Sequence, residues 1–245
     1  MKQVLLLAMV IALFNPLQGS AQQDLTKDII KTAKGNLEIT FIGHGSLMFG
    51  FDGKVIHVDP FGRLADYSKL PKADMIFITH EHVDHFDPTV IEQLRTEKTI
   101  ILLPESCANR IGGGTVMRNG DVEELGGLRV EAVPAYNVIH EYRKGVPFHP
   151  KGVGNGYVIT FGDLRVYLAG DTENIPEMKN LEDIDIAFLP MNFPYTMTPE
   201  MVADAAKAFK PRILYPYHYG ETDTSEIVNL LKDVKEIRVL IRPMK

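Results

Sequence analysis

The chain has 245 residues, of which 45% are hydrophobic, and a formal net charge of −6. This composition supports a domain with a substantial core and excludes a disordered or fibrous chain. The negative charge makes nucleic acids and anionic membranes poor partners, so we expect a small-molecule substrate. The single cysteine, Cys107, excludes an internal disulfide and offers at most one thiolate ligand to a metal.

The first 21 residues have the pattern of a secretory signal peptide. Lys2 precedes an apolar run from Val4 to Phe14, and the small residues Gly19-Ser20-Ala21 follow it. An uncleaved membrane anchor is disfavoured because the run is shorter than the roughly 20 residues that span a bilayer. We therefore expect cleavage after Ala21, no stable membrane anchor afterwards, and export, which means the periplasm in a cell with two membranes.

Residues 22–36 form an N-terminal segment, and residues 37–245 are predicted to be one domain because no low-complexity linker interrupts them. Short apolar runs separated by turn residues predict the elements of the first half. In chain order these are strands at Leu37–Ile42, Ser46–Phe51, Lys54–Val58 and Ala73–Ile78, a helix from Asp87-Pro88 to Leu94, a strand at Thr99–Leu103 and a helix near Ser106–Ile111.

The second half continues the mixture of strands and helices. Strands are predicted at Leu128–Ala135, Gly156–Phe161, Leu164–Ala169, Ile184–Leu189, Arg212–Tyr217 and Ile237–Ile241, with helices from Pro199 to Phe209 and near Ser225–Leu231. Strands first, then strands mixed with helices, predict an α/β (α+β) domain with two sheets in contact and helices outside.

Residues with metal-binding side chains follow three of the predicted strands directly. His80, His82, Asp84 and His85 come after the apolar run Met75–Ile78, Asp171 follows Val166–Gly170, and His218 follows Ile213–Tyr217. Because strand ends place side chains at one edge of a sheet, we expect the three groups to converge. Imidazole and carboxylate bind zinc and neighbouring metals, and these donors are too many for one structural ion. The pattern predicts a hydrolytic site with two metal ions.

These residues resemble the ligand signature of the metallo-β-lactamase superfamily. Four further segments are similar to the branch that contains L-ascorbate phosphate lactonase and uncharacterised metal-dependent hydrolases, with the N-acyl-phosphatidylethanolamine-hydrolysing phospholipase D more distant: Gly43–Ser46, Ala169–Thr172, Thr196–Glu200 and Tyr217–Gly220. The resemblance runs from about Leu37 to the end of the chain. It implies a four-layer αββα sandwich, the metallo-β-lactamase fold, with a dinuclear site at one edge.

The resemblance also implies a ligand set for each ion. One ion would be bound by His80 and His82, the other by Asp84, His85 and His218, with Asp171 between them. The branch places a third histidine for the first ion after the strand matching Val130–Ala135, but this chain has Asn137 there. His140, His149 or Asn137 itself would have to complete that ion's ligands. We favour His149, because its loop precedes a strand and can fold over the cleft, whereas His140 adjoins the charged run Glu141–Lys144.

Other polar residues are assigned to the surroundings of the site. Asp59 is predicted to accept the second ring N–H of a ligand histidine. His44, in a glycine-flanked turn, is placed at the substrate entrance, with an ordinary exposed histidine as an equal alternative. His57 lies within a strand and is predicted to be structural. Tyr136, Tyr195 and Lys151 are candidates for substrate contacts, with simple packing as the alternative for the tyrosines.

We expect an exported metal-dependent hydrolase that uses a metal-bridged hydroxide on an ester, lactone or phosphodiester. Asp84 is the expected catalytic residue, placed to hold or relay the proton. Two divalent ions are the expected cofactors, with zinc favoured and manganese or iron compatible. The alternative is a non-catalytic metal-binding or sensing protein that retains the site. A β-lactamase acting on antibiotics is a third interpretation, and its resemblance is weaker.

Overall fold

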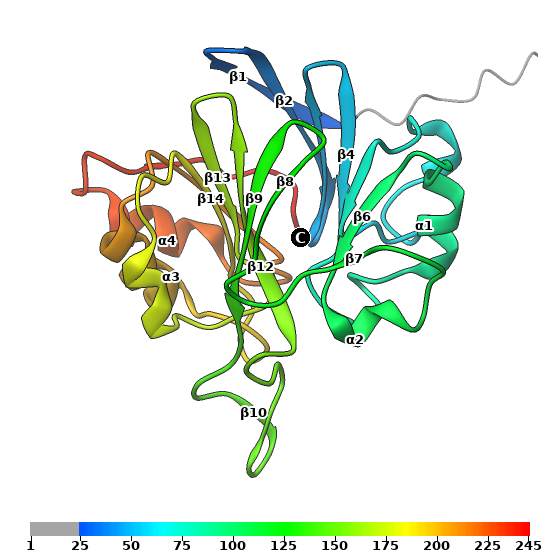
Figure 1. Cartoon of the computed structure of the whole chain (residues 1–245). Helices are drawn as coiled ribbons and strands as arrows, with labels where there is room; N and C mark the ends of the chain where they lie inside the picture. Colours follow the sequence, from blue (N-terminus) through cyan, green and yellow to red (C-terminus); the bar gives the residue numbers. More distant parts are fainter. Residues whose placement is uncertain (1–24) are drawn as a thin grey trace, which may run out of the picture.

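The structure is a computed structural model that describes residues 25–245 (Figure 1). The predicted signal peptide, residues 1–21, lies outside the described residues. Within residues 25–245, no helix is both long enough and apolar enough to cross a membrane.

Two seven-stranded sheets pack face to face, and helices cover their outer faces (Figure 1). The helices α1 (Pro88–Leu94) and α2 (Glu105–Ala108) cover the first sheet. The helices α3 (Pro199–Phe209) and α4 (Thr224–Leu231) cover the second sheet. This arrangement confirms the predicted four-layer αββα sandwich.

The first sheet has the order β1-β2-β3-β4-β5-β6-β7. Its pairs are antiparallel from β1 to β4 and parallel from β4 to β7. The strands are β1 (Thr26–Thr32), β2 (Gly35–Gly43), β3 (Ser46–Phe51), β4 (Lys54–Val58), β5 (Met75–Phe77), β6 (Ile100–Leu103) and β7 (Thr115–Val116). The 3-10 helix η1 (Tyr67–Lys69) lies between β4 and β5.

The second sheet has the order β16-β15-β14-β13-β12-β9-β8. Its pairs are antiparallel from β8 to β13 and parallel from β13 to β16. The strands are β8 (Val122–Leu125), β9 (Leu128–Ala135), β12 (Gly154–Phe161), β13 (Leu164–Leu168), β14 (Ile186–Pro190), β15 (Ile213–Tyr217) and β16 (Arg238–Val239). A separate hairpin joins β10 (Glu141–Arg143) to β11 (Val146–Pro147), and the 3-10 helix η2 (Pro176–Asn180) follows β13.

Three apolar clusters hold the four layers together. The first lies between the sheets, where the Phe41 and Phe49 rings meet those of Phe188 and Phe161. The other two lie between each sheet and its helices. Burial of apolar surface is the dominant stabilising contribution to such layers. The layers fix the strand ends in space, and the candidate site is built on those ends.

The first sheet begins earlier than the sequence indicated. β1 lies inside the segment 22–36 that was set apart from the domain, yet it pairs with β2 along seven residues. Its sequence, TKDIIKT, alternates weakly and its side chains are mostly exposed or half-buried, so hydrophobic patterning does not reveal it. The hairpin β10–β11 and the edge strand β8 were missed for the same reason, since most of their residues are exposed.

His57, on β4, is structural, as predicted, and gives a testable dependence of stability on pH. Its ring is fully buried, and its Nε2 donates to the carbonyl of Pro71 at 3.1 Å. Burial lowers the pKa of His57 from 6.5 to about 4, with the Pro71 carbonyl opposing the shift. Between these values the unfolded chain binds a proton that the folded protein excludes, so stability falls as pH falls from 6.5 to 4.

The expected contribution of His57 is on the order of 2–3 kcal/mol over that interval. The variant His57→Gln should therefore lose less unfolding free energy than the wild type between pH 6.5 and 4, measured by urea titration. Equal pH dependence in the two proteins would show that His57 does not contribute.

Candidate metal centre

Six histidines and two aspartates converge at one edge of the sandwich. The loop between β5 and α1 supplies His80, His82, Asp84 and His85; the turn between β2 and β3 supplies His44; and His149, Asp171 and His218 follow β11, β13 and β15. β5 and β15 are parallel to neighbours within their own sheets, so their carboxyl ends point toward this edge.

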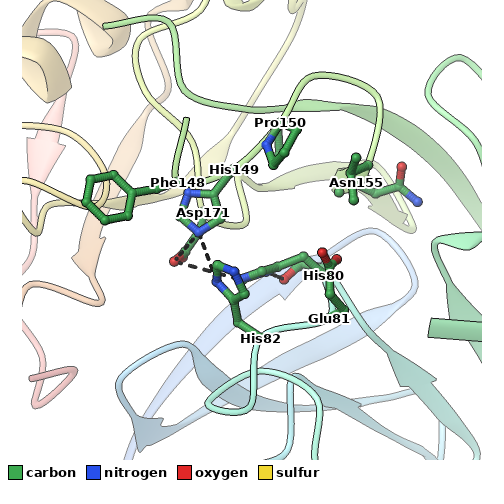
Figure 2. A pocket seen from close by; sticks show the side chains of 12 residues that line it. His80, Glu81, His82, Phe148, His149, Pro150, Asn155 and Asp171 are labelled. Carbon is green, nitrogen blue, oxygen red and sulfur yellow. Dashed lines mark hydrogen bonds and ion pairs between the residues drawn. The ribbon is translucent and has the colours of Figure 1, made fainter. Parts of the chain in front are cut away.

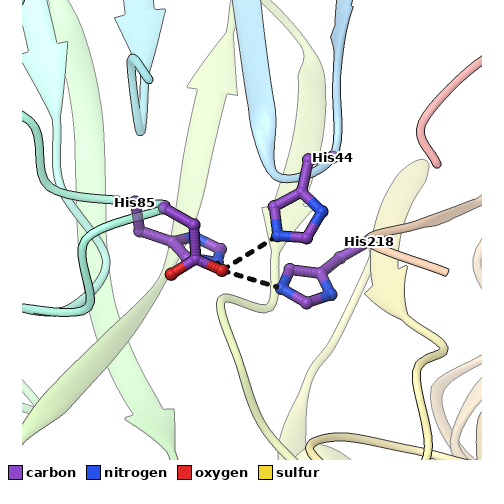
Figure 3. Close-up of side chains that lie close together, drawn as sticks. His44, His85 and His218 are labelled. Atoms are coloured by element: carbon purple, nitrogen blue, oxygen red, sulfur yellow. Dashed lines mark hydrogen bonds and ion pairs between the residues drawn. The ribbon is translucent and has the colours of Figure 1, made fainter. Parts of the chain in front are cut away.

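The side chains form two groups with Asp171 beside both. The ligand atoms of His80, His82 and His149 lie within 4.8 Å of one another, and so do those of His44, Asp84, His85 and His218. Figure 2 shows His82 and His149 beside Asp171, and Figure 3 shows the rings of His44, His85 and His218 close together. One oxygen of Asp171, Oδ2, lies 3.4 Å from His149 Nε2 and 3.3 Å from His218 Nε2. Asp171 therefore has the position expected of a bridging carboxylate.

Several buried ligand atoms in these groups have no hydrogen-bond partner among the described residues. They are the Nε2 atoms of His80, His85 and His218 and the Oδ1 atom of Asp171. An unpartnered buried polar atom costs about 1–3 kcal/mol, and here four such atoms are close together. Divalent ions between them would satisfy all four. Six imidazoles and two carboxylates without a thiolate form a donor set that suits two such ions.

Asp59 and Thr79 orient two of these histidines. Asp59 is fully buried after β4, and its Oδ2 lies 2.9 Å from His85 Nδ1. The Thr79 hydroxyl donates to the same oxygen at 2.6 Å and so accepts from His80 Nδ1 at 2.9 Å. Both rings then present Nε2 to the centre of the cluster. The predicted hydrogen bond between Asp59 and a histidine of the cluster is confirmed.

The protonation states around Asp171 favour a bound cation. Burial lowers the pKa of His218 to about 4 and that of His80 well below its usual value, so both rings are neutral at pH 7. Burial alone would raise the pKa of Asp171, but its interactions with the surrounding histidines together lower it well below its usual value. Carboxylates led by Asp171 outweigh burial at His85 and raise its pKa to about 9. The cluster therefore attracts positive charge.

Asn137 stands where the superfamily branch places a third histidine for the ion at His80 and His82. In the structure, His149 lies beside these two histidines instead. Its Nε2 lies 3.2 Å from His82 Nδ1, and its Nδ1 lies 2.7 Å from Asn137 Oδ1. Asn137 points its amide nitrogen away, donating to Glu173 Oε1 at 3.0 Å and to the Tyr195 carbonyl at 2.9 Å. Asn137 therefore orients His149 and is not placed as a ligand itself.

His140, the other candidate, lies outside both groups. Its Nδ1 is 2.9 Å from Glu173 Oε1 and 3.2 Å from the Thr196 carbonyl. Glu173 is fully buried, and it also accepts backbone N–H groups from Val138, Ile139 and His140. Burial would raise the pKa of Glu173, but the Asn137 amide and these N–H groups lower it. The sequence analysis missed Glu173, whose only signal was its position two residues after Asp171.

His44 lies closer to the metal-binding side chains than the prediction of a residue at the substrate entrance indicated. Its Nε2 lies 3.0 Å from Asp84 Oδ2, and its ring centroid is 3.7 Å from that of His218. The backbone N–H of His218 also donates to the His44 carbonyl at 3.0 Å. The structure therefore places His44 beside the second group of ligands, where it holds Asp84 in place.

A cleft of about 720 Å³ opens over the cluster. Its lining residues include His44, His82, Asp84, His149, Asp171, Asn192, Tyr195 and His218. Tyr195 is thus in the predicted position for a substrate contact. Tyr136 and Lys151 do not line this cleft, because both bind Glu177: the Tyr136 hydroxyl donates to it at 2.9 Å and Lys151 Nζ lies 2.7 Å from it. The structure therefore gives no support to Tyr136 and Lys151 as substrate contacts in this cleft, and for Tyr136 it favours the packing alternative.

The position of Asn137 leads to an expected result for metal affinity. In Asn137→Ala, the His149 Nδ1 loses its acceptor, so the orientation of the ring is no longer fixed. We expect one of the two ions to bind about 10–100-fold more weakly, measured by competition with a chromogenic chelator. Asn229→Ala, at an exposed position on α4, is the matched control and should bind both ions normally. Unchanged affinity in Asn137→Ala, with a normal melting temperature, would contradict this role.

Comparison with known proteins agrees with this geometry. Residues 38–218 match the model of the Beta-lactamase superfamily domain. The chain belongs to the metallo-β-lactamase superfamily. The UPF0173 metal-dependent hydrolase of Thermococcus onnurineus (strain NA1) is 30% identical over 221 residues, which are 83% of this chain and 96% of that protein.

Two crystal structures are also similar. A candidate metal-dependent hydrolase from Parabacteroides distasonis ATCC 8503 is 50% identical with a TM-score of 0.86, covering 90% of this chain and all of that one. Igni18, a metallo hydrolase from Ignicoccus hospitalis KIN4/I, is 26% identical with a TM-score of 0.69, covering 85% of this chain and 96% of that one. The similarity to these proteins and the histidine and aspartate groups described above together identify the protein as a metal-dependent hydrolase of the superfamily.

Proposed function

We propose that the protein is an exported hydrolase of an ester, lactone or phosphodiester, and that it binds two divalent ions. The observation that carries the proposal is the set of buried, unpartnered imidazole and carboxylate atoms around Asp171, next to the open cleft. Zinc is favoured because the donors are mostly imidazoles, and manganese or iron would also accept this set of nitrogen and oxygen ligands.

The proposed ligands follow the two groups, except that His44 would orient Asp84 and not bind an ion itself. His80, His82 and His149 would hold one ion, Asp84, His85 and His218 the other, and Asp171 would contact both. When bound, two such ions would lower the pKa of a water molecule toward neutrality and would polarise the bond under attack.

Asp84 is the group best placed to handle the proton. Its side chain is 37% exposed and lines the cleft, so a substrate can approach it. Burial would raise its pKa, but the hydrogen bond from His44 and the charge of His85 lower it, so the group is an ionised acceptor at neutral pH. The contact with His44 keeps one carboxylate oxygen in a fixed direction. Asp84 would hold the proton released by the attacking water until the leaving group takes it.

The proposed location and partner rest on the sequence. The signal-peptide pattern of residues 1–21 supports export to the periplasm, and the net charge of −6 supports a small-molecule substrate rather than nucleic acid. Periplasmic extracts should contain a mature chain that starts at Gln22, identified by N-terminal sequencing. A chain retained in the cytoplasm with its leader intact would contradict export.

A substrate panel tests the activity. Protein loaded with zinc or manganese is assayed on lactones, esters, thioesters and phosphodiesters, with His82→Ala as the control. We expect metal-dependent turnover of at least one class and its loss in His82→Ala. No metal-dependent turnover of any class would favour a non-catalytic metal-binding or sensing role. Hydrolysis of nitrocefin in preference to the panel would assign the protein to the β-lactamases.

A further inference from the structure

One wall of the cleft is apolar and aromatic. The hairpin β10–β11 contributes Tyr142 and Val146, the residue before His149 is Phe148, and Tyr195 lies on the segment that precedes α3. Figure 1 shows this hairpin projecting from the body of the sandwich. The hairpin therefore contributes to the lining of the cleft from outside the packed layers.

The apolar wall, defined as Tyr142, Val146, Phe148 and Tyr195, is open to solvent. Tyr142 is 72% exposed, Tyr195 48% and Val146 37%. The Phe148 ring lies between the two tyrosines, with centroids 6.0 Å from Tyr142 and 5.1 Å from Tyr195, both edge-to-face. Exposed aromatic and aliphatic side chains gathered in a cleft indicate a binding surface. Because Phe148 adjoins His149 in the chain, the wall runs directly to the proposed metal ligands.

The charged residues of the cleft point to a neutral substrate. Among the described residues that line it, none is lysine or arginine. Its ionisable groups are histidines and the carboxylates of Glu81, Asp84 and Asp171. Phosphate groups are usually recognised by arginine or lysine, through paired hydrogen bonds or a compact positive charge. Apart from the proposed ions, a phosphodiester would find no positively charged group here, whereas a carboxylic ester needs none.

We infer that the substrate is a neutral carboxylic ester or lactone whose apolar acyl chain lies on the apolar wall. The inference rests on the proposed function and narrows it. In the reaction, the oxygen of water bonds to the acyl carbon, the acyl C–O bond breaks, and the alcohol oxygen takes a proton. The products are an alcohol and a carboxylic acid that ionises at neutral pH. For a lactone, both groups remain in one molecule.

A homologous series of esters tests the wall. The zinc-loaded protein is assayed with p-nitrophenyl acetate, butyrate and hexanoate, and with bis(p-nitrophenyl) phosphate. Each buried methylene should raise kcat/KM about fourfold, so hexanoate, which has four more methylenes, should exceed acetate by roughly 250-fold. Equal kcat/KM along the series, or faster hydrolysis of the phosphodiester than of hexanoate, would overturn the inference.

Substitutions in the wall separate binding from chemistry. In Tyr142→Ser and Val146→Ser, KM for hexanoate should rise several-fold to about tenfold with kcat nearly unchanged, because the lost contacts bind the acyl group. For acetate, which has no acyl chain beyond its methyl group, KM should rise much less than for hexanoate. Val228→Ser is the matched control, since Val228 is 41% exposed on α4 and does not line the cleft. An equal loss for acetate and hexanoate would contradict a role in acyl recognition.

A binding measurement distinguishes failure of this inference from failure of the proposed function. The neutral fluorescent probe N-phenyl-1-naphthylamine should bind the wild type and Val228→Ser equally, and Tyr142→Ser several-fold more weakly. Probe binding at the wall without turnover of any panel substrate would reject the proposed hydrolysis, and with it the ester. Ester turnover without wall-dependent binding would reject the wall alone. A Tyr142→Ser variant that changes only the oligomeric state, measured by light scattering, would assign the wall to self-association and overturn the inference.

Discussion

Asp171→Ala is expected to reduce the metal content from two ions per chain to one or fewer, and to lower kcat/KM by about a thousandfold. Among residues 25–245, Asp171 is the one carboxylate within 3.5 Å of histidines from both groups, at His149, His218 and His85. Without it, neither of the two proposed ions would keep its full set of ligands, and no carboxylate would link them. Loss of a metal's charge stabilisation costs several kcal/mol in the transition state, which corresponds to this fall in rate.

The control for this substitution lies at the opposite end of β13, the strand that Asp171 follows. Asp163→Ala lies in the exposed turn before β13 and should retain two ions and full activity. Elemental analysis of the purified proteins and kinetics on the best panel substrate provide the two measurements. Two tightly bound ions in Asp171→Ala would show that this residue does not bridge them.

His149→Ala is expected to lose one ion and to lower kcat/KM by about a hundredfold or more, whereas His140→Ala should keep both ions. The difference follows from position: His149 Nε2 faces His82 and Asp171, while His140 Nδ1 faces Glu173 and the Thr196 carbonyl. Removing an ion that polarises the substrate costs several kcal/mol. Cobalt-substituted protein gives a second measurement, because loss of one imidazole changes the visible spectrum of the bound ion.

The two histidine variants are matched, since both residues lie between β9 and β12 and both substitutions are histidine to alanine. Loss of an ion from His140→Ala with retention in His149→Ala would reverse the assignment. If both variants kept both ions, neither His149 nor His140 would be the third imidazole beside His80 and His82. That result would reject the proposed ligand set.

The layers of the fold were predictable because burial imposes a pattern on the sequence. Ile76 and Phe77 on β5, and Phe188 on β14, are buried in continuous apolar runs that mark strands. The helix α1 was equally clear, since Asp87 caps it by accepting from the N–H groups of Thr89 and Val90. Strands at exposed edges carry no such pattern, and so β1, β8 and the hairpin β10–β11 were visible only in the structure.

The site was predictable where its residues are close in the sequence or follow a strand. His80, His82, Asp84 and His85 fall in one short segment, and Asp171 and His218 each follow an apolar run. The contacts that orient the site residues join parts of the chain that are distant in sequence. Glu173 accepts a hydrogen bond from Asn137, more than thirty residues earlier, and Lys151 binds Glu177 instead of lining the cleft. No local pattern specifies such pairs, because the packing of β9, β12 and β13 brings them together.

The number of ions bound per chain tests the central claim most directly. Metal-free protein should be titrated with zinc while binding is followed by competition with a chelator, and the loaded protein should then be analysed for its zinc content. The proposed centre predicts two tightly bound ions per chain, with hydrolysis of the panel substrates dependent on them. One tight ion, or none, in correctly folded protein would contradict a dinuclear site built around Asp171.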